Sequence, residues 1–210
     1  MKILKNITYL ALVVLTVASC DIADPIESEI TEYANFEMTG DSFLYIQTGT
    51  PFVEPGVNAT AGGEELEVEI SGSVDSQTPG VYNLTYSAVN SDGFPASVSR
   101  LVAVGDKEVA FNRDLSGVYL TGTRSNTVTR TAPGVYQNSD VLPNNGISVF
   151  MVDLGNGSLI IPSQPSRFGS VAADPSVDAA SFGVLNSESS FTLNLKIGGN
   201  PIFVRTFLKQ

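Results

Sequence analysis

The chain has 210 residues, among them no histidine, no tryptophan and one cysteine, and its formal net charge at pH 7 is −11. Without histidine, a Ser-His-Asp or Cys-His catalytic arrangement cannot form, and zinc loses its most common ligand. The negative charge repels phosphate backbones, so we expect no nucleic-acid partner.

The first residues have the pattern of a targeting segment. Two lysines give a positive start, and residues 7–19 are mostly apolar. This run suits a signal peptide and is short for a membrane span, which needs ~20 residues. Small residues, Ala18 and Ser19, precede Cys20, as cleavage by a signal peptidase requires.

The stretch Val17-Ala18-Ser19-Cys20 resembles the lipobox of bacterial lipoproteins. The resemblance implies that residues 1–19 are a cleaved signal peptide and that the Cys20 thiol carries lipid, which anchors the chain to a membrane. As the only cysteine, Cys20 cannot form an internal disulfide, which agrees with this role. The alternative is an ordinary secreted protein with an unrelated cysteine at the junction.

Residues 20–40 are predicted to form an acidic tether, which like charges would extend. Asp21, Asp24, Glu27 and Glu29 also resemble the surface-export signal of Bacteroides-type lipoproteins, although they are interspersed and not contiguous. The resemblance implies an outer-membrane lipoprotein exposed on the cell surface. A location on the periplasmic face is the alternative.

Residues 41–106 have the pattern of short strands separated by turns. Four runs predict strands: 43–47, 65–71, 81–89 and 97–104. In the second run, Leu66, Val68 and Ile70 are predicted to face a core, while the glutamates between them face solvent. Pro-Gly, Gly-Gly and Asp-Gly pairs predict the turns, and strands at this spacing predict a β-sandwich.

The same segment resembles the bacterial immunoglobulin-like (Ig-like) domain that is often repeated in surface proteins. The matching residues are Glu54-Pro55-Gly56-Val57, Gly72, Val74-Asp75, Gly80, Tyr82, Leu84-Thr85-Tyr86, Asp92 and Arg100. Glu54 stands where the family has Asp, and the hairpin SDGFPAS replaces the usual Asp-x-x-Gly-Asn. The resemblance implies a spacer or display module without chemistry of its own.

The charge changes sharply after this segment. Residues 21–106 carry fifteen acidic residues and one basic residue, whereas residues 107–210 carry seven acidic and eight basic residues. This step predicts two domains, a sandwich at 41–106 and a second domain at 107–210.

Residues 107–210 are predicted to be all-β as well. Seven runs predict strands: 117–123, 127–131, 134–138, 147–154, 158–161, 191–197 and 201–208. The phrases DLSGVY and APGVY resemble the C-terminal domain of Bacteroides-group lipoproteins, which implies an all-β module of unassigned function. We expect an antiparallel domain, either a small barrel or a lipocalin-like sheet. In the Gly-Val-Tyr phrases, we expect each tyrosine to start a strand with its ring inward and its hydroxyl near the rim.

The stretch 162–183 is the longest one without a predicted strand. Loops of this length are usually functional or disordered, so it is either a binding loop or a mobile or locally packed one. Without tryptophan, stacking on a sugar ring falls to tyrosine or phenylalanine. The candidate ligand-binding residues are Tyr136, Arg167, Phe168 and Phe182.

Paired carboxylates are the one catalytic arrangement that the composition leaves open. The candidates are Asp114, Asp140, Asp153, Asp174, Asp178 and Glu188, and their spacing selects no pair. The glutamates of residues 64–69 are oxygen ligands that calcium prefers, but their alternation indicates a solvated strand face. We therefore expect no enzyme activity, no metal and no cofactor.

Two functions remain. The first is an accessory surface lipoprotein, anchored through its lipid, that captures a polysaccharide or another ligand for an uptake system. The second is a structural or assembly lipoprotein that docks onto another envelope protein through strand edges or exposed phenylalanines.

Overall fold

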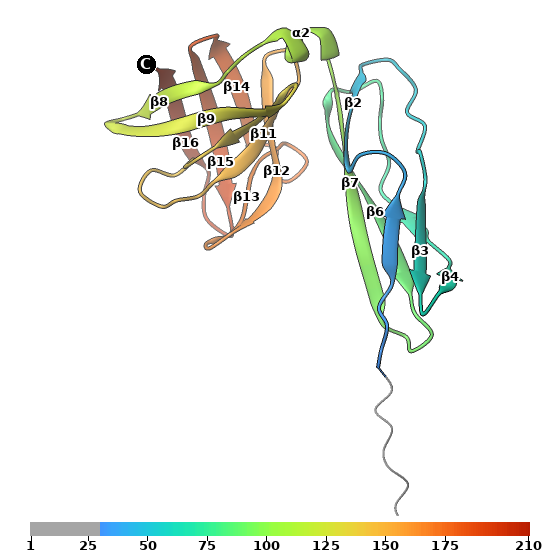
Figure 1. Cartoon of the computed structure of the whole chain (residues 1–210). Coiled ribbons are helices and arrows are strands. Elements are labelled where there is room, and N and C mark those ends of the chain that lie inside the picture. The colour runs from blue at the N-terminus through green and yellow to red at the C-terminus, as the bar shows by residue number, and fades with distance from the viewer. Residues whose placement is uncertain (1–29) are drawn as a thin grey trace, which may run out of the picture. The chain divides into compact units, whose positions relative to one another are not determined.

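The computed structural model describes residues 30–210 (Figure 1). The predicted signal peptide 1–19, the lipidation site Cys20 and the acidic residues at 21–29 lie outside the described residues. Tyr33–Gln210 form one compact unit that is almost entirely β. None of the helices within residues 30–210 is long and apolar enough to cross a membrane.

Two small sheets form the first part of this unit. The three-stranded sheet has the order β1 (Asn35–Met38), β3 (Val57–Ala61) and β4 (Glu64–Leu66). The four-stranded sheet has the order β2 (Phe43–Gln47), β7 (Pro95–Gly105), β6 (Gly80–Val89) and β5 (Glu69–Ser71). The pair β2–β7 is parallel, and the other pairs are antiparallel.

The two sheets pack face to face. Successive side chains of a strand point to opposite faces, so one set of alternate residues shares a core. Leu84, Tyr86 and Val102 of the four-stranded sheet are buried there, and Phe36 and Val57 of the three-stranded sheet pack against them. This arrangement confirms the predicted sandwich.

The glutamate-rich run 65–71 is two strands and not one. β4 ends at Leu66, β5 begins at Glu69, and the two strands belong to different sheets. Val68 still packs toward the core, but Ile70 lies on an edge strand with 56% of its surface exposed. Ile70 lies opposite the core residue Tyr86 and so shares its face of the sheet, as predicted, but its place on the edge strand leaves it exposed.

A short helix, α2 (Lys107–Asn112), leads from β7 into the second part of the unit. The side chain of Asp106 caps it by accepting a hydrogen bond from the backbone N–H of Val109 at 3.2 Å.

The second part is a closed antiparallel barrel, which confirms the prediction of a small barrel. Its strands are β8 (Gly117–Thr121), β9 (Arg124–Ala132), β10 (Val135–Asn138), β11 (Val149–Asp153), β12 (Ser158–Ser166), β13 (Gly169–Ala173), β14 (Phe182–Ser187), β15 (Ser190–Ile197) and β16 (Phe203–Lys209). β16 pairs with β8 and closes the ring. Because neighbouring strands follow one another in sequence, the barrel is of the up-and-down type.

β13 and β14 share one position in the barrel. Both pair with β12 on one side and with β15 on the other, so they form one strand interrupted by residues 174–181. Eight strand positions result. The expectation that 162–183 is irregular is therefore wrong for most of its length, because β12 continues to Ser166 through two prolines and two further strands follow.

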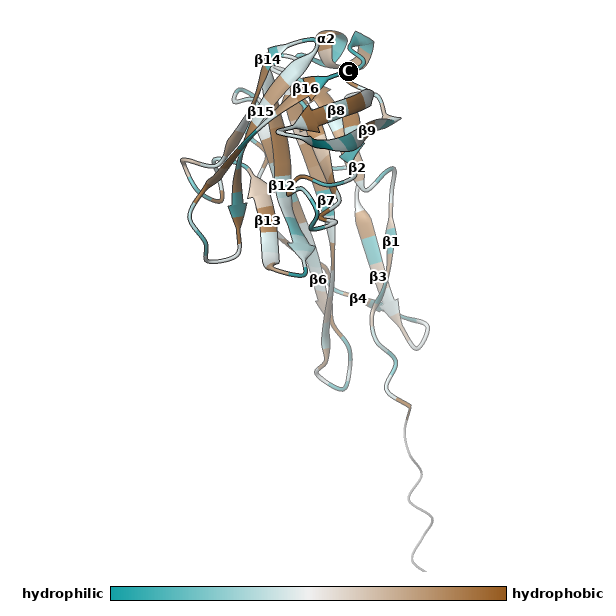
Figure 2. Cartoon of the chain, turned by 90° about the vertical axis from the view of Figure 1, so that its left-hand side faces the viewer, coloured by the Kyte–Doolittle hydropathy of each residue, from teal (hydrophilic) through white to brown (hydrophobic). Residues whose placement is uncertain are grey.

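Side chains fill the barrel. The ring of Phe191 stacks on that of Phe207 at 4.8 Å between centroids, and Tyr119 packs against Phe191 at 5.0 Å. All three are fully buried. Hydrophobic residues, brown in Figure 2, follow the barrel strands and are clearest on β12 and β16. The interior is thus a packed core.

Tyrosine hydroxyls form hydrogen bonds that stabilise the starts of two strands. The hydroxyl of Tyr82 donates to the carbonyl of Thr78 at 2.7 Å, and that of Tyr119 donates to the carbonyl of Leu115 at 2.8 Å. Each bond reaches four residues upstream, which is the geometry of a tyrosine corner. The Gly-Val-Tyr phrases therefore mark strand starts.

Candidate functional site

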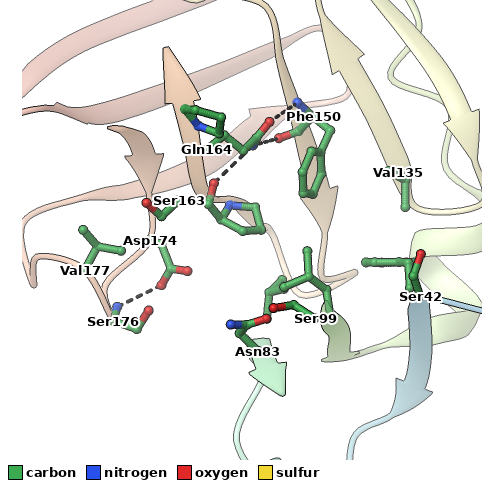
Figure 3. A pocket seen from close by; sticks show the side chains of 15 residues that line it. Ser42, Asn83, Ser99, Val135, Phe150, Ser163, Gln164, Asp174, Ser176 and Val177 are labelled. Atoms are coloured by element: carbon green, nitrogen blue, oxygen red, sulfur yellow. Dashed lines mark hydrogen bonds between the residues drawn. The ribbon is translucent and has the colours of Figure 1, made fainter. Parts of the chain in front are cut away.

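A cleft of about 730 Å³ lies between the four-stranded sheet and the barrel wall (Figure 3). The sheet contributes Ser42, Phe43, Val81, Asn83, Ser99 and Leu101. The barrel contributes Val135, Phe150, Pro162, Ser163, Gln164, Pro165, Asp174, Ser176 and Val177. This volume falls within the ~300–1,000 Å³ typical of small-molecule sites.

The sheet presents to the cleft the face that does not contact the sandwich core. Phe43 of β2 and Asn83 of β6 both pair with Leu101 of β7, so the three residues form a row across the sheet. Their neighbours Leu84 and Val102 point the other way, into the sandwich. Positions 43, 81, 83, 99 and 101 of this face are therefore available to a ligand, whereas Tyr45 and Ala103 are buried against the barrel.

A glutamine side chain shapes the barrel wall. β11 and β12 pair only at Val152–Asp153, and beyond Ile161 the register of β12 shifts. There the amide of Gln164 accepts a hydrogen bond from the N–H of Phe150 at 2.9 Å and donates one to its carbonyl at 2.8 Å. Gln164 thus replaces backbone pairing, and it fixes the strand that directs the phenyl ring of Phe150 into the cleft (Figure 3).

A buried tyrosine joins the sheet to the barrel beside the cleft. The hydroxyl of Tyr45 donates to the carbonyl of Asp153 at 2.9 Å, and its ring meets Phe111 edge-on at 5.2 Å. Burial, followed by the nearby carboxylate of Asp153, raises the pKa of Tyr45 well above its usual value, so the hydroxyl remains a donor. Both carboxylate oxygens of Asp153 accept from the Arg113 guanidinium at 2.8 Å.

Asp174 is the one ionisable residue among those that line the cleft. The residue is 7% exposed, and its Oδ1 accepts a hydrogen bond from the N–H of Ser176 at 2.8 Å. The hydroxyl of Ser181 donates to the carbonyls of Ala172 and Asn194 at 3.1 Å and thereby pins the loop 174–181. A single carboxylate cannot supply the acid and base that glycoside hydrolysis requires.

Three more of the candidate catalytic carboxylates have structural partners. Asp153 pairs with Arg113 in the barrel, and Asp178 lies 3.3 Å from the ammonium of Lys196. Asp140 accepts hydrogen bonds from three backbone N–H groups of its own loop.

The structure brings together one pair of these candidates, Asp114 and Glu188, which line a separate pocket of about 530 Å³. Hydrogen bonds from the hydroxyl and N–H of Ser116 lower the pKa of Asp114, so it remains ionised and is unsuited to act as a general acid. No group of three or more Asp, Glu, His or Cys side chains within residues 30–210 is placed to hold a metal ion.

The four sequence-predicted ligand residues lie outside the cleft. Tyr136 is fully buried in the barrel core, where its hydroxyl donates to the carbonyl of Arg113 at 2.7 Å. Arg167 and Phe168 meet at the tip between β12 and β13, with the guanidinium 4.9 Å from the centre of the exposed ring. Phe182 begins β14 and is 38% exposed.

Sequence reasoning missed Phe43, Asn83 and Phe150. The signal for the first two was available, because alternation in 43–47 and 81–89 leaves a second face that carries both apolar and polar side chains. The stretch 162–183 supplies seven of the fifteen residues that line the cleft, although not the ones that the sequence suggested.

Comparison with known proteins is informative for the first part of the chain. No curated protein matches the chain. A crystal structure of a lipoprotein from Bacteroides thetaiotaomicron shares 25% sequence identity over 85% of this chain and 100% of its own, with a TM-score of 0.38. A Clostridium perfringens structure with an M60 catalytic domain and two CBM51 domains shares 13% identity over 86% of this chain and 21% of its own, with a TM-score of 0.31. Residues 36–104 match the family model described as "Bacterial surface protein, Ig-like domain", so this part of the chain is a bacterial surface Ig-like domain.

Proposed function

We propose that the chain is a non-catalytic, lipid-anchored protein of the bacterial outer membrane that binds a neutral saccharide in the cleft at the cell surface. The lipobox-like sequence that ends at Cys20 supports the anchor. The Ig-like domain, which belongs to a family of bacterial surface proteins, supports the location. In this proposal the sandwich, which β1 extends to residues 35–106, and the barrel of residues 107–210 are two domains that share one site.

The lining of the cleft carries the proposal. A sugar ring has an apolar C–H face and a polar edge of hydroxyl groups. Phe43 and Phe150 offer phenyl rings to the apolar face. Asn83, Ser99 and Ser163 offer amide and hydroxyl groups to the polar edge. This combination suits a saccharide better than it suits a purely apolar ligand.

The charge of the cleft selects a neutral ligand. Its lining contains one carboxylate, Asp174, and no lysine or arginine. An acidic saccharide would enter without a cation to pair with its charge, and unpaired charges are costly to bury. We therefore expect neutral oligosaccharides to bind and acidic ones to be excluded.

Calorimetric titration of the purified full chain tests the proposal, with Cys20→Ala included to prevent lipidation. The probes are a panel of neutral and acidic oligosaccharides. Phe150→Ala and Asn83→Ala are each expected to weaken binding of a neutral oligosaccharide at least tenfold. The matched control is Phe168→Ala, which removes an exposed phenyl ring outside the cleft and should leave affinity unchanged. Binding that depends on Phe168 and not on Phe150, or no binding by any neutral probe, would reject the cleft as the site.

The proposed location needs its own test. Intact cells that produce the chain with a C-terminal tag are treated with protease and compared with cells producing the Cys20→Ala variant. Cleavage on whole cells supports surface exposure. Protection until the outer membrane is broken would place the chain on the periplasmic face and would contradict surface capture.

An assembly role is the second candidate, favoured by apolar side chains on the outside of the barrel. Val204 and Leu208 of β16 and Val118 of β8 are each about half exposed. Such side chains suit a protein contact. Val204→Glu is expected to abolish crosslinking to an envelope partner while leaving saccharide binding intact, and unchanged crosslinking would count against this role.

A further inference from the structure

Asp174 follows β13 directly and is held in place by hydrogen bonds to all of its polar groups except one. Its N–H donates to the hydroxyl of Ser181 at 3.3 Å, and its carbonyl accepts from the N–H groups of Val177 at 3.0 Å and Asp178 at 3.3 Å. Its Oδ1 accepts from the N–H of Ser176 at 2.8 Å. The carboxylate is therefore fixed in position before a ligand arrives.

The exception is Oδ2, the second carboxylate oxygen of Asp174. It accepts no hydrogen bond and joins no ion pair within residues 30–210. It is nevertheless in reach of the cleft, because it is not among the unpaired atoms of these residues that are sealed inside the protein. Figure 3 shows this oxygen turned away from Ser176 and toward the cleft. Since the rest of the residue is almost entirely buried, a partner for Oδ2 has to come from the cleft.

Asp174 differs in kind from the other polar side chains that line the cleft. Those are serine hydroxyls and the amides of Asn83 and Gln164, which can each donate as well as accept. A carboxyl group is ordinarily ionised at neutral pH, and in that form it can only accept. Asp174 is thus the one lining side chain that needs a proton from the ligand.

The protein supplies no cation to Asp174. The cleft is lined by no lysine or arginine, and Lys196 of the neighbouring strand β15 lies 3.3 Å from the carboxylate of Asp178 instead. A largely buried acceptor without a donor costs more free energy when it is charged than when it is neutral. A hydrogen bond to an ionised oxygen is also about twice as strong as one between neutral groups. A donor group on the ligand therefore gains most at this position.

We propose that Asp174 determines the specificity of the cleft by accepting a hydrogen bond at Oδ2 from one hydroxyl group of the sugar. This inference rests on the function proposed above and adds which chemical group of the saccharide is recognised. A hydroxyl supplies the proton that Oδ2 lacks, whereas a fluorine atom or an ether oxygen at the same ring position does not. The cleft therefore requires a free hydroxyl at one ring position, and a sugar that is linked or substituted there is rejected.

NMR titration of the 15N,13C-labelled full chain, with Cys20→Ala to prevent lipidation, tests this inference. The probes are methyl glycosides of glucose, galactose and mannose, each with a series of analogues in which fluorine replaces one hydroxyl at a time. Fluorine is close in size to a hydroxyl group but carries no proton. At one ring position the replacement should weaken binding by about tenfold or more, because it leaves Oδ2 unpaired.

Asp174→Asn shows whether Asp174 is the partner of that hydroxyl. The amide oxygen can keep the bond from the N–H of Ser176, and this bond directs the amide nitrogen to the place of Oδ2. A donor at that place needs no proton from the sugar, so the penalty for fluorine should be lost. Asp178→Asn is the matched control, because it removes the other carboxylate of the same loop, which lies outside the lining of the cleft. It should leave the penalty unchanged.

The carboxyl carbon signal of Asp174 gives a measurement that needs no variant. It should shift with the parent glycoside and not with the analogue that lacks the critical hydroxyl. Binding that depends on Phe150 but tolerates fluorine at every position would overturn this inference alone, as would a penalty that survives Asp174→Asn. If no glycoside shifts the amide signals of Phe43 and Asn83, the cleft is not a saccharide site, and the proposed function fails together with this inference.

Discussion

The guanidinium of Arg100 lies 3.3 Å from the carboxylate of Glu54 at the edge of the sandwich, with the arginine side chain fully buried. The same guanidinium donates to the carbonyls of Thr39 at 2.8 Å and Asp41 at 3.0 Å. Arg100 belongs to β7, whereas Thr39 and Asp41 lie between β1 and β2. One side chain therefore ties the long hairpin to the chain segments that link the two sheets.

We expect Arg100→Ala to lower the free energy of unfolding by about 3–5 kcal/mol. Removing one partner of a buried ion pair leaves the other charge and several carbonyl groups without their donor. Urea denaturation measures the change, with Arg124→Ala as a control at an exposed position that should stay within ~0.5 kcal/mol. A loss for Arg100→Ala as small as that of the control would show that the ion pair is dispensable.

Stability should also fall at alkaline pH. Burial is the main cause that raises the pKa of Tyr86 to about 12, and it raises that of Tyr119 to about 12 as well. A raised pKa means that the folded state keeps its proton while the unfolded chain, with a pKa near 10, loses it. The stabilisation is therefore complete below pH 10 and disappears as the pH rises to about 12, by ~1.4 kcal/mol per pH unit for each tyrosine.

Urea denaturation between pH 8 and pH 11.5 measures this slope. Burial also raises the pKa values of Tyr45, Tyr82 and Tyr136, so several phenols contribute to the slope. Tyr86→Phe removes one of them and should reduce the slope by the share of one tyrosine, ~1.4 kcal/mol per pH unit. Tyr33→Phe is the control, because Tyr33 is well exposed. A slope that is identical in Tyr86→Phe and in the unmodified chain would contradict the assignment to Tyr86.

Much of the fold could be predicted from local patterns. Alternation in the run 81–89 and the Asp-Gly pair after it correctly indicate the hairpin of β6 and β7. The motif residues Glu54 and Arg100 also correctly indicate the Ig-like domain, and the structure shows why they occur together, since they form the ion pair.

Two features could not be predicted because they depend on tertiary structure. The run 65–71 alternates without interruption, yet the chain changes sheets at residues 67–68, which periodicity does not record. β13 and β14 follow a segment with two prolines and contain small or polar residues, so neither has a strong strand pattern by itself. Barrel closure places them between β12 and β15, and that pairing makes them strands.

Gly105 should not tolerate a side chain. A Cβ atom at this position would collide with the carbonyl of Leu154 and with the hydroxyl of Tyr45, where the sheet meets the barrel. We expect Gly105→Ala to cost about 1–3 kcal/mol of unfolding free energy. The substitution should also weaken the binding of any ligand in the cleft, because the contact between Gly105 and Leu154 beside the cleft must shift.

Gly199→Ala is the matched control, because a Cβ atom there meets no other atom within 4 Å. Thermal denaturation of both variants gives the comparison. Equal melting temperatures for Gly105→Ala and Gly199→Ala would show that the junction is loose enough to accept a methyl group.

The Gln164 side chain replaces backbone pairing at the seam between β11 and β12. A substitution whose hydrogen bonding depends on protonation tests this seam. Gln164→Glu keeps the size of the side chain, but an ionised carboxylate can only accept a hydrogen bond. It therefore retains the bond from the N–H of Phe150 and loses the one to its carbonyl. We expect a loss of about 1–3 kcal/mol at pH 7. We also expect faster hydrogen exchange in the half of β11 that begins at Val149.

Acid should restore part of this loss, since a protonated carboxyl group has an O–H that can donate to the Phe150 carbonyl. A carboxyl group ordinarily titrates near pH 4, so the difference in unfolding free energy between Gln164→Glu and the unmodified chain should narrow below that pH. Gln164→Leu is the control, because it can form neither bond at any pH. If both variants lose equal stability at pH 7 and neither recovers in acid, the seam does not depend on the two hydrogen bonds. The orientation of Phe150 toward the cleft would then need another cause.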